Sequence, residues 1–294
     1  MGGPALAPVH GPRRSFSGHA QPFGVSRHDA RMNPQRNWPA APAARSRSWW
    51  TVAFLGEVLL AGARRARGGA GSAPGEWRRL LDHAGPRSVP IVLLTCSLIG
   101  LMLAYMAGAQ LGRIGAQGYL ADVVTVGMVR ELAGMMTGIV LAGRVGASFA
   151  SQLASMRAGE EIDALRALGV DPVAHLVLPR LGALVLLAPP LILLGALAGV
   201  LAGWPAAVLA YGLSSPEYLH QCLRALTPTH LWIGLFKGVL YAALVALASC
   251  REGLHAGRSA QAVGEATTAA VVRSLVWIVA AACTTTVVFT ALGY

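Results

Sequence analysis

The sequence predicts an all-α, polytopic inner-membrane protein with five transmembrane helices, preceded by an interfacial amphipathic helix. The first observation is composition: of 294 residues, 54% are hydrophobic and 13% are charged, whereas soluble domains carry about 25% charged residues. The second is a set of long stretches with no charge, and the third is a bias of basic residues toward alternate loops. Together these observations exclude a soluble globular domain and a disordered chain.

The positive charge of the chain is concentrated near its N-terminus. Residues 1–90 hold 13 of the 24 Lys and Arg residues against four acidic residues. Residues 1–47 contain seven prolines and five glycines, a composition that cannot bury a core, so we expect a disordered basic tail there. A basic tail suits a nucleic acid or an anionic membrane face. Next to an apolar body it favours the membrane, and we expect no nucleic-acid partner.

Residues 48–87 are expected to form interfacial amphipathic helices. Trp50, Phe54 and Val58 recur at i, i+4 and i+8, which places them on one helical face. A helix of about 14 residues is too short to cross a bilayer, which needs about 20. It should therefore lie in the headgroup plane, and a second amphipathic piece is expected at residues 76–83.

Residues 88–294 should form the five-span membrane domain. A charge at the bilayer centre costs about 2.5–3.5 kcal/mol on insertion scales, so gaps between charges mark the spans. Three gaps are free of charge and two contain one charge each, Arg144 and Lys237. The expected spans are residues 88–112, 132–156, 181–216, 225–250 and 274–294. Glycines at every fourth position of residues 195–203 permit close contact between helices.

The basic residues of the loops predict the orientation. With the N-terminus inside, the outer loops hold Arg113 and Arg224, with Arg130 near the outer start of the second span. The inner loops hold six arginines, at positions 157, 166, 180, 251, 258 and 273. Because cytoplasmic loops carry the excess of positive charge, we expect a cytoplasmic N-terminus and an outer C-terminus, which is periplasmic if the cell is Gram-negative.

The inner loop after the second span predicts a short amphipathic helix parallel to the membrane. Ile162, Leu165 and Leu168 recur at i, i+3 and i+6, Gly169 is a suitable C-terminal cap, and acidic side chains flank the apolar residues. These acidic residues are Glu160, Glu161 and Asp163. Such a helix either closes a loop at the surface or acts as a coupling helix that docks into a partner's groove. It looks like the Glu-Ala-Ala loop of ABC importer permeases.

A specific family resemblance covers about residues 76–294. It rests on a series of segments in order: residues 114–119 (Ile-Gly-Ala-Gln-Gly-Tyr), 130–132 (Arg-Glu-Leu), 141–148 (Leu-Ala-Gly-Arg-Val-Gly-Ala-Ser), 156–172 and 259–268. These segments resemble the MlaE/YrbE-type permeases of MCE-associated lipid ABC transporters. Residues 133–134 read Ala-Gly where such permeases usually read Gly-Pro, and Met106 stands where Gln is usual.

The resemblance implies a permease subunit that moves phospholipids or related lipids between the inner membrane and the periplasm. Two copies would pair, bind two cytoplasmic ABC ATPase subunits, and meet a periplasmic MCE-domain protein. The chain itself would not be an enzyme and would bind no cofactor, with ATP and Mg²⁺ on the partner ATPase. In agreement, no G-x-x-x-x-G-K-[ST] phosphate loop occurs in the sequence.

Charges within the spans are candidates for function, because a charge facing lipid is costly. Arg130 and Glu131, at the expected outer entrance of the second span, could line a lipid cavity, with Arg130 available to a phosphate; the alternative is a structural ion pair. Lys237, the only lysine, needs a partner, either a carboxylate such as Glu131 or a lipid phosphate. For Arg144, packing against a helix or a neighbouring subunit is the favoured interpretation.

The sequence offers little support for other classes of function. The histidines show no metal-ligand spacing and the cysteines no close pair, so we expect no metal site. A membrane-embedded lipid-modifying enzyme would need a nucleophile–base pairing, and none has a recognisable spacing. A non-transporting membrane anchor for a cytoplasmic partner is the third interpretation.

Overall fold

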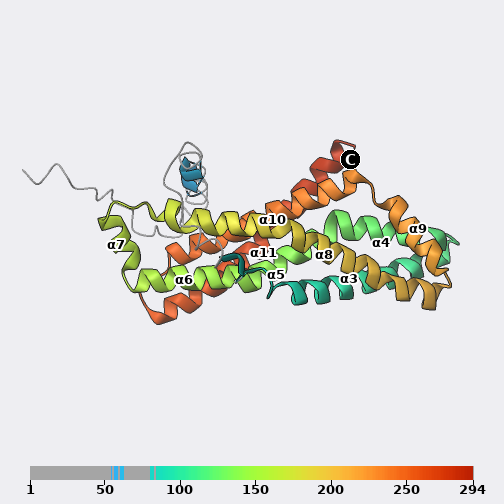
Figure 1. Ribbon diagram of the computed structural model, residues 1–294, viewed down its shortest axis with the longest axis horizontal. Coiled ribbons are helices and arrows are strands. Elements are labelled where there is room, and N and C mark those ends of the chain that lie inside the picture. The colour runs from blue at the N-terminus through green and yellow to red at the C-terminus, as the bar shows by residue number, and fades with distance from the viewer. Residues whose placement is uncertain (1–53, 55, 59, 63–79, 83, 294) are drawn as a thin grey trace, which may run out of the picture. The chain divides into compact units, whose positions relative to one another are not determined.

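The described residues lie in helices or in the turns between them (Figure 1). The computed structural model describes residues 54, 56–58, 60–62, 80–82 and 84–293. Within these residues there is no strand, which confirms the all-α prediction. The expected tail at residues 1–47 and much of the expected interfacial segment lie outside the described residues.

Five segments of the described chain are long and apolar enough to cross a bilayer, as predicted. They are Val89–Arg113, Gln117–Ala158, Val173–Tyr211, Pro228–Leu254 and Ala260–Ala291. Even the shortest has 25 residues, and at a rise of 1.5 Å per residue it covers about 37 Å. The chain is therefore a multi-pass membrane protein.

The second span is longer than predicted. It begins with a 3₁₀ turn and continues through two π-helical turns that join three α-helices. In order these are η3 (Gln117–Tyr119), α4 (Leu120–Gly127), η4 (Met128–Leu132), α5 (Ala133–Leu141), η5 (Ala142–Gly146) and α6 (Ala147–Ala158). The predicted start at residue 132 was wrong, because Arg130 and Glu131 do not end the span. They lie within it, and the carboxylate of Glu131 is neutralised by another helix.

The third span ends earlier than predicted. It consists of η6 (Val173–Val177) and α8 (Leu178–Tyr211), and Gly212 follows with a φ of +69°. A residue with positive φ ends a helix, and glycine adopts it without a steric penalty. The span therefore stops five residues before the predicted end at residue 216.

A separate amphipathic helix, α9 (Ser215–Ala225), follows the third span. Its buried residues, Tyr218 and Cys222, face the bundle, where α9 packs on α4. The Tyr218 hydroxyl donates to the carbonyl oxygen of Val200 at 2.8 Å. The sequence had suggested an ordinary outer loop here, and the structure replaces it with a helix anchored to the spans.

The last two spans are α10 (Pro228–Leu254) and α11 (Ala260–Ala291). The fifth span was predicted to begin at residue 274, and this was wrong. Arg273 marked the expected boundary, but its guanidinium pairs with Glu252 of α10, so the helix continues on both sides of it. Most of the segment at residues 259–268, expected in a loop, forms the first turns of α11.

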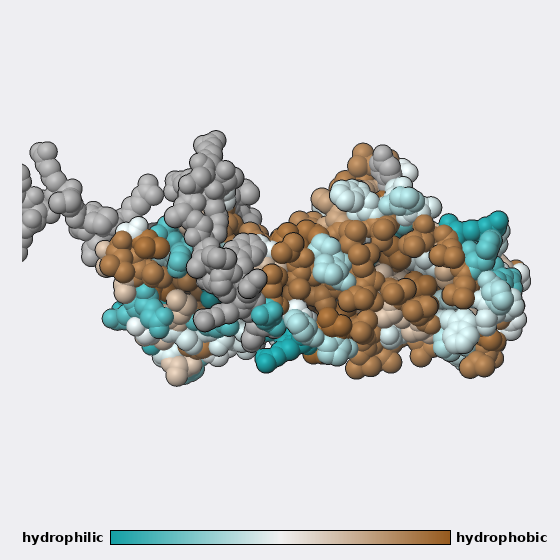
Figure 2. Space-filling model, viewed as in Figure 1, coloured by the Kyte–Doolittle hydropathy of each residue, from teal (hydrophilic) through white to brown (hydrophobic). Residues whose placement is uncertain are grey.

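The helices differ in how much of their surface the chain itself covers. α10 packs against α11, α6, α8 and α5. Of its most apolar stretch of 18 residues, 56% is buried, whereas in α11 the corresponding share is 11%. Figure 2 shows the uncovered apolar side chains as a broad band, with hydrophilic residues toward the ends of the molecule. Lipid or another chain must cover this band, and α11 most of all.

The predicted close contact at the glycines of the third span is confirmed. α3 (Val89–Arg113) and α8 are extensively packed, and a Cβ on Gly100 would lie 2.1 Å from the carbonyl oxygen of Gly199. No side chain fits at that distance. The two backbones approach this closely because both positions are glycine.

The described part of the expected interfacial helix packs on the chain itself. Phe54, Val58 and Ala61 are buried in an apolar cluster that also contains Ile162 and Leu254. The sequence had assigned the face with Phe54 and Val58 to the headgroup plane; in the structure this part of it contacts protein. Leu60, by contrast, is 59% exposed.

Candidate functional site

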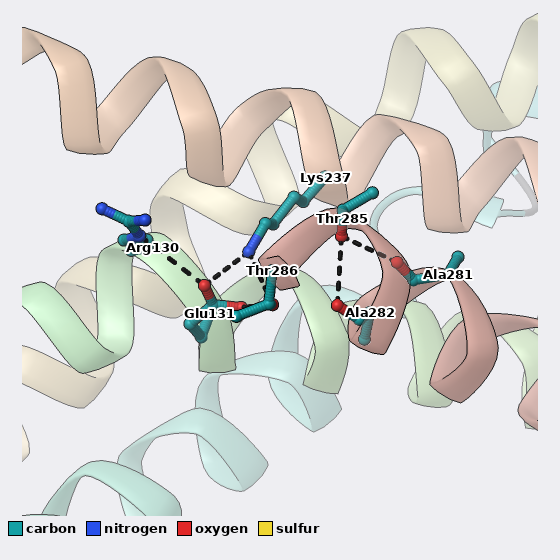
Figure 3. A network of polar contacts seen from close by, with 7 residues as sticks. All are labelled: Arg130, Glu131, Lys237, Ala281, Ala282, Thr285 and Thr286. Atoms are coloured by element: carbon teal, nitrogen blue, oxygen red, sulfur yellow. Dashed lines mark hydrogen bonds and ion pairs between the residues drawn. The ribbon is translucent and has the colours of Figure 1, made fainter. Parts of the chain in front are cut away.

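An ionic network joins the second, fourth and fifth spans (Figure 3). The ammonium of Lys237, on α10, donates to Glu131 Oε1 in η4 and, at 3.0 Å, to Thr286 Oγ1 on α11. Thr286 Oγ1 donates in turn to Glu131 Oε2 at 3.2 Å. Arg130 Nε lies 3.7 Å from Glu131 Oε1. Of the two partners that the sequence left open for Lys237, the structure shows the carboxylate.

The members of the network differ in burial. Lys237 is 1% exposed, whereas the side chains of Arg130 and Glu131 are 15% and 33% exposed. A buried ammonium without a partner would be very costly, so Glu131 is required to neutralise it. The network thus has a buried end at Lys237 and an accessible edge at Arg130 and Glu131.

This network carries a surplus of positive charge. Arg130 and Lys237 contribute two cations against the single carboxylate of Glu131. In a surrounding of low dielectric constant, a surplus charge attracts a counter-ion more strongly than it does in water. The accessible edge is therefore suited to an anionic group such as a phosphate.

Two glycines allow α10 to bring Lys237 into this position. A Cβ on Gly234 would lie 2.0 Å from the carbonyl oxygen of Val129, and one on Gly238 would lie 2.3 Å from Ile192 Cδ1. Gly234 therefore excludes any side chain, because the atom in the way belongs to the backbone, whereas a side chain at Gly238 would require Ile192 to move. Gly234 lies one turn of helix before Lys237, and Gly238 directly follows it. The close approach of α10 to the second span at Gly234 therefore lies beside the ion pair.

The backbone under Arg130 and Glu131 is a π-helical turn, η4. Such turns are rare, because their hydrogen bonds are less favourable than those of an α-helix, and they occur frequently at functional sites. A second π-turn, η5, carries Arg144. Its guanidinium donates to the Ser88 hydroxyl at 2.6 Å, just before α3, which supports the packing role favoured for this residue.

Thr286 and Phe289, which the sequence did not single out, also contact Lys237. Lys237 Nζ lies 5.8 Å from the centre of the Phe289 ring, close enough for a cation–π attraction, and this ring packs edge-on against Phe236. The available signal was the run of three threonines at residues 284–286 inside an apolar span. Thr285 bonds to the carbonyl oxygen of Ala281 at 2.7 Å, so only the structure distinguishes Thr286 from its neighbours.

The predicted short helix is present as α7 (Glu161–Ala167), at the end of the bundle opposite α9 (Figure 1). Gly169 follows with a φ of +76°, and the amide of Val170 donates to the carbonyl oxygen of Leu165 at 3.0 Å. The helix therefore ends where the sequence predicted, and for the predicted reason.

The apolar ridge expected on α7 is divided between two environments. Ile162 is 1% exposed and lies in the same buried cluster as Phe54, so its expected contact with a partner's groove was wrong: its side chain faces its own chain. Leu165 packs partly against that cluster. Leu168 is 78% exposed and is the residue of the ridge that remains available to a partner.

The three acidic residues around α7 also have distinct positions. Asp163 pairs with Arg166 at 3.2 Å and with Arg258 at 2.8 Å. Glu160 lies 3.3 Å from Arg258. Glu161 is exposed in the first turn of α7.

Comparison with known proteins identifies the family. The family model described as Permease MlaE matches residues 78–288. The chain belongs to the MlaE permease family. It is 36% identical to a probable ABC transporter permease protein of Rickettsia prowazekii, over 68% of this chain and 77% of the relative. It is 32% identical to a probable ABC transporter permease protein of Synechocystis, over 67% and 75%.

A plant relative of this MlaE permease matches with similar strength. The chain is 34% identical to the chloroplastic protein Trigalactosyldiacylglycerol 1 of Arabidopsis thaliana, over 69% of this chain and 59% of the relative. Membership of the family confirms the resemblance found in the sequence and makes the chain a transporter permease subunit rather than an enzyme. An ABC transporter permease implies an ATPase partner.

Proposed function

We propose that this MlaE permease is the membrane subunit of an ABC transporter that moves phospholipids or related lipids between the inner membrane and the periplasm. The observation that carries this proposal is the cationic network of Arg130, Glu131 and Lys237 within an otherwise apolar bundle. A lipid with an anionic headgroup has the matching combination of charge and apolar chain.

An apolar groove close to the network supports a lipid substrate. It lies between α10 and α11, has a volume of about 370 Å³ and borders Thr285, the neighbour of Thr286. Its lining includes Leu240, Leu244 and Trp277. A headgroup at Arg130 and an acyl chain against such a surface would satisfy both parts of a lipid. The Arabidopsis relative is named after a galactolipid, which agrees with a lipid as substrate.

In this proposal the orientation of the chain in the membrane is inferred from the positions of its basic residues. Contacts of Arg157, Arg258 and Arg273 gather at the end that carries α7, whereas Arg224 belongs to α9 at the other end. By the positive-inside rule the α7 end is cytoplasmic. The N-terminus is then cytoplasmic and the C-terminus periplasmic, where the expected MCE-domain partner would meet the α9 end.

The energy for transport comes from a separate cytoplasmic ATPase that binds ATP and Mg²⁺. In this proposal residues 160–168 couple the two subunits, with Leu168 inserted into an apolar groove of the ATPase. Glu161, in the first turn of α7, is also exposed. Two copies of the chain pair through α11, whose outward face the single chain leaves uncovered, and they enclose the lipid between them.

The first test uses the complex from native membranes. We expect a tagged chain, solubilised in mild detergent, to bring an ABC ATPase subunit with it. Reconstituted in vesicles with fluorescent phosphatidylglycerol, the complex should transfer the lipid when ATP is present and not with a non-hydrolysable analogue. Lipid modification by the chain alone would instead indicate an enzyme, and ATPase binding without any lipid transfer would indicate an anchor.

Variants of the network test the proposed lipid contact. Arg130→Gln should lower the transfer of phosphatidylglycerol about ten-fold or more, since a charge-assisted contact contributes about 1.5–3 kcal/mol. ATPase binding should be unchanged. The control is Arg144→Gln, which loses the bond to Ser88 but lies outside the network. Equal transfer by Arg130→Gln and the wild type would contradict the lipid contact.

Variants of α7 test the coupling. Leu168→Asp should release the ATPase, because a carboxylate would be buried in an apolar groove, while membrane insertion stays intact. Leu165→Asp should also release it, but with a loss of thermal stability, since Leu165 packs partly against the chain's own cluster. The matched control is Leu223→Asp on α9, where the leucine is 74% exposed at the other end of the bundle. Retention of the ATPase by Leu168→Asp would refute the docking of α7.

A further inference from the structure

The short helix α7 is tied to the loop that joins α10 and α11. Arg258 in this loop reaches Asp163 on α7 at 2.8 Å with Nη2 and Glu160 at 3.3 Å with Nη1. These two contacts bridge 95 and 98 residues of sequence. One guanidinium thus holds two carboxylates of the α7 region at once.

The same junction has backbone and apolar contacts. Arg157, at the end of α6, donates to the carbonyl oxygen of Leu254, the last residue of α10. Leu254 and Ile162 of α7 belong to one buried cluster. A Cβ on Gly253 would lie 2.8 Å from the carbonyl oxygen of Ala150, so α6 and the last turn of α10 are in direct backbone contact. Displacement of α7 must therefore act on the end of α10.

α10 leads from this junction to the ionic network. Lys237 lies 17 residues before Leu254, which is about 26 Å along a continuous helix. Near its C-terminal end, α10 is also joined to α11 through Glu252, which pairs with Arg273 and, at 2.9 Å, with Arg251. α10 and α11, which contribute to the network together with η4, are therefore both connected to α7 through Arg258 and its neighbours.

We propose that Arg258 is a positioning residue that transmits the movement of α7 to α10, and through α10 to the Lys237–Glu131 pair. The inference rests on the proposed function of α7 as the coupling helix. Movement of α7 then reaches the end of α10 through side-chain contacts, in addition to the backbone that links α7 to its neighbouring helices. Arg258 contacts neither the lipid nor the ATPase in this role.

The backbone at Glu160 fits this assignment. Its φ is +60°, and it is the one non-glycine residue with positive φ in the described chain. A side chain in this region is strained, and glycine, which already occupies position 159, avoids the strain. A glutamate at position 160 is therefore present despite a backbone cost, which agrees with a role for its side chain other than stabilising the fold.

The exposure of the three side chains distinguishes the proposed positioning role of Arg258 from a role in stabilising the fold. The side chains of Arg258, Glu160 and Asp163 are 63%, 69% and 44% exposed, and exposed ion pairs contribute little to stability. Removing the contact should therefore leave thermal stability unchanged. Its effect belongs to the coupling between ATP hydrolysis and lipid transfer.

The test measures lipid transferred per ATP hydrolysed in the reconstituted complex. Arg258→Glu should keep the ATPase bound and its ATP turnover within about two-fold of the wild type, while lipid per ATP falls about five-fold or more, the lower end of typical coupling effects. Arg258→Lys should retain most of the coupling. The charge-swapped variant, Arg258→Glu with Asp163→Arg and Glu160→Arg, should regain at least about half of it. The control is Arg87→Glu, an exposed arginine outside the ion pairs of the described residues.

Three results would overturn the inference. Unchanged lipid per ATP in Arg258→Glu would show that the contact transmits nothing. Loss of the ATPase from Arg258→Glu would place this arginine in the ATPase interface. Equal coupling defects in Arg258→Lys and Arg258→Glu, with no recovery after the charge swap, would show that the ion pairs are not what matters. A wild-type complex that binds no ATPase or moves no lipid would refute the proposed function itself, before any variant is compared.

Discussion

Lys237 shows how an apolar bundle accommodates a charge. Its ammonium is held by a carboxylate from η4 and by a hydroxyl and an aromatic ring from α11. Each of these groups is individually modest in strength, but together they replace the water that a buried cation loses. The pair with Glu131 is therefore as much a condition of folding as a feature of the site.

The energetic dependence of this pair is testable with two variants. Glu131→Gln alone should destabilise the protein by about 3–5 kcal/mol, because it leaves the buried ammonium of Lys237 without its carboxylate partner. Combining it with Lys237→Met should recover at least half of this loss, since neither position then carries a charge. The measurement is the temperature at which half of the detergent-solubilised protein remains monodisperse. Equal destabilisation by the single and the double variant would contradict a mutually neutralising pair.

His255 makes the stability of the protein sensitive to acid. It lies directly after α10, where its Nδ1 is 2.8 Å from the carbonyl oxygen of Arg251. Burial lowers the pKa of His255 below its ordinary value of 6.5, and the positive charges of Arg251, Arg157 and Arg166 lower it further. The folded protein therefore binds this proton less readily than the unfolded chain does.

The sign of the effect follows from linkage. Above about pH 6.5 the imidazole is neutral in both states, and it contributes no pH dependence. As the pH falls below that value, the unfolded chain gains the proton first, so stability decreases until the pH reaches the lowered pKa. His255→Gln should lose less thermal stability than the wild type between about pH 7.5 and pH 5.5. Identical losses in the two proteins would contradict this assignment.

Helix packing at the network depends on the absence of side chains. At Gly234 the approach to Val129 leaves no space for a methyl group, whereas at Gly264, near the start of α11, nothing lies within 4 Å of an added Cβ. The same substitution should therefore have opposite effects at the two positions. This contrast separates the packing requirement from the general effect of glycine in a helix.

Gly234→Ala should displace α10 from the second span and destabilise the protein by about 1–3 kcal/mol, as overpacking does. Lipid transfer should fall with it, because Lys237 is one turn away. Gly264→Ala should be neutral or stabilising by up to about 1 kcal/mol, since alanine is the better helix former. Thermal unfolding and lipid transfer of both variants provide the check, and equal tolerance at the two positions would contradict the crossing.

The limits of prediction from the sequence are visible in where the spans begin. Charge gaps located five spans and came within a residue of the ends of α3. The same rule failed at Glu131 and Arg273, because each is neutralised by a residue far along the chain, Lys237 or Glu252. A single sequence does not reveal such partners. A span that contains a satisfied charge near one end is therefore predicted too short.

Features with local causes were predicted better. The end of α7 depends on Gly169, a neighbour in the sequence, and it was predicted correctly. The direction in which Ile162 points depends on Phe54 and Leu254, and it was not. Likewise Arg130, Glu131 and Lys237 could be chosen as charges in apolar surroundings, but Thr286 joins them only through the packing of α11 against α10.

At the scale of the whole molecule, a single copy of the chain leaves both a polar site and an apolar helix face uncovered. The network has an accessible edge, and α11 leaves an uncovered face made largely of β-branched and small side chains. Its exposed members include Val272, Val276, Val279, Cys283 and Val287. Small residues let helices approach closely in a bilayer. A second copy of the chain would cover this face and close the site at the same time.

The arrangement of cysteines makes this pairing directly testable. Cys283 is exposed on α11, whereas Cys96, Cys222 and Cys250 are buried, and these are the four cysteines of the sequence. In intact membranes, oxidation with copper phenanthroline should therefore link two chains through α11. We expect a disulfide-linked dimer from Cys283, or from Val276→Cys or Val287→Cys in a Cys283→Ser background. These two positions lie on the same face, about two turns before and one turn after Cys283.

The controls determine whether such a link reports a specific interface. Cys283→Ser should abolish dimer formation by the natural chain, and Leu98→Cys in that background, on the exposed face of α3, should form none. Because oxidation requires two sulfurs within a few ångströms, linkage at α11 without linkage at α3 would locate the shared face. Linkage at neither helix, or equally at both, would mean that α11 does not hold two copies together. The lipid site would then have to be closed by some other chain.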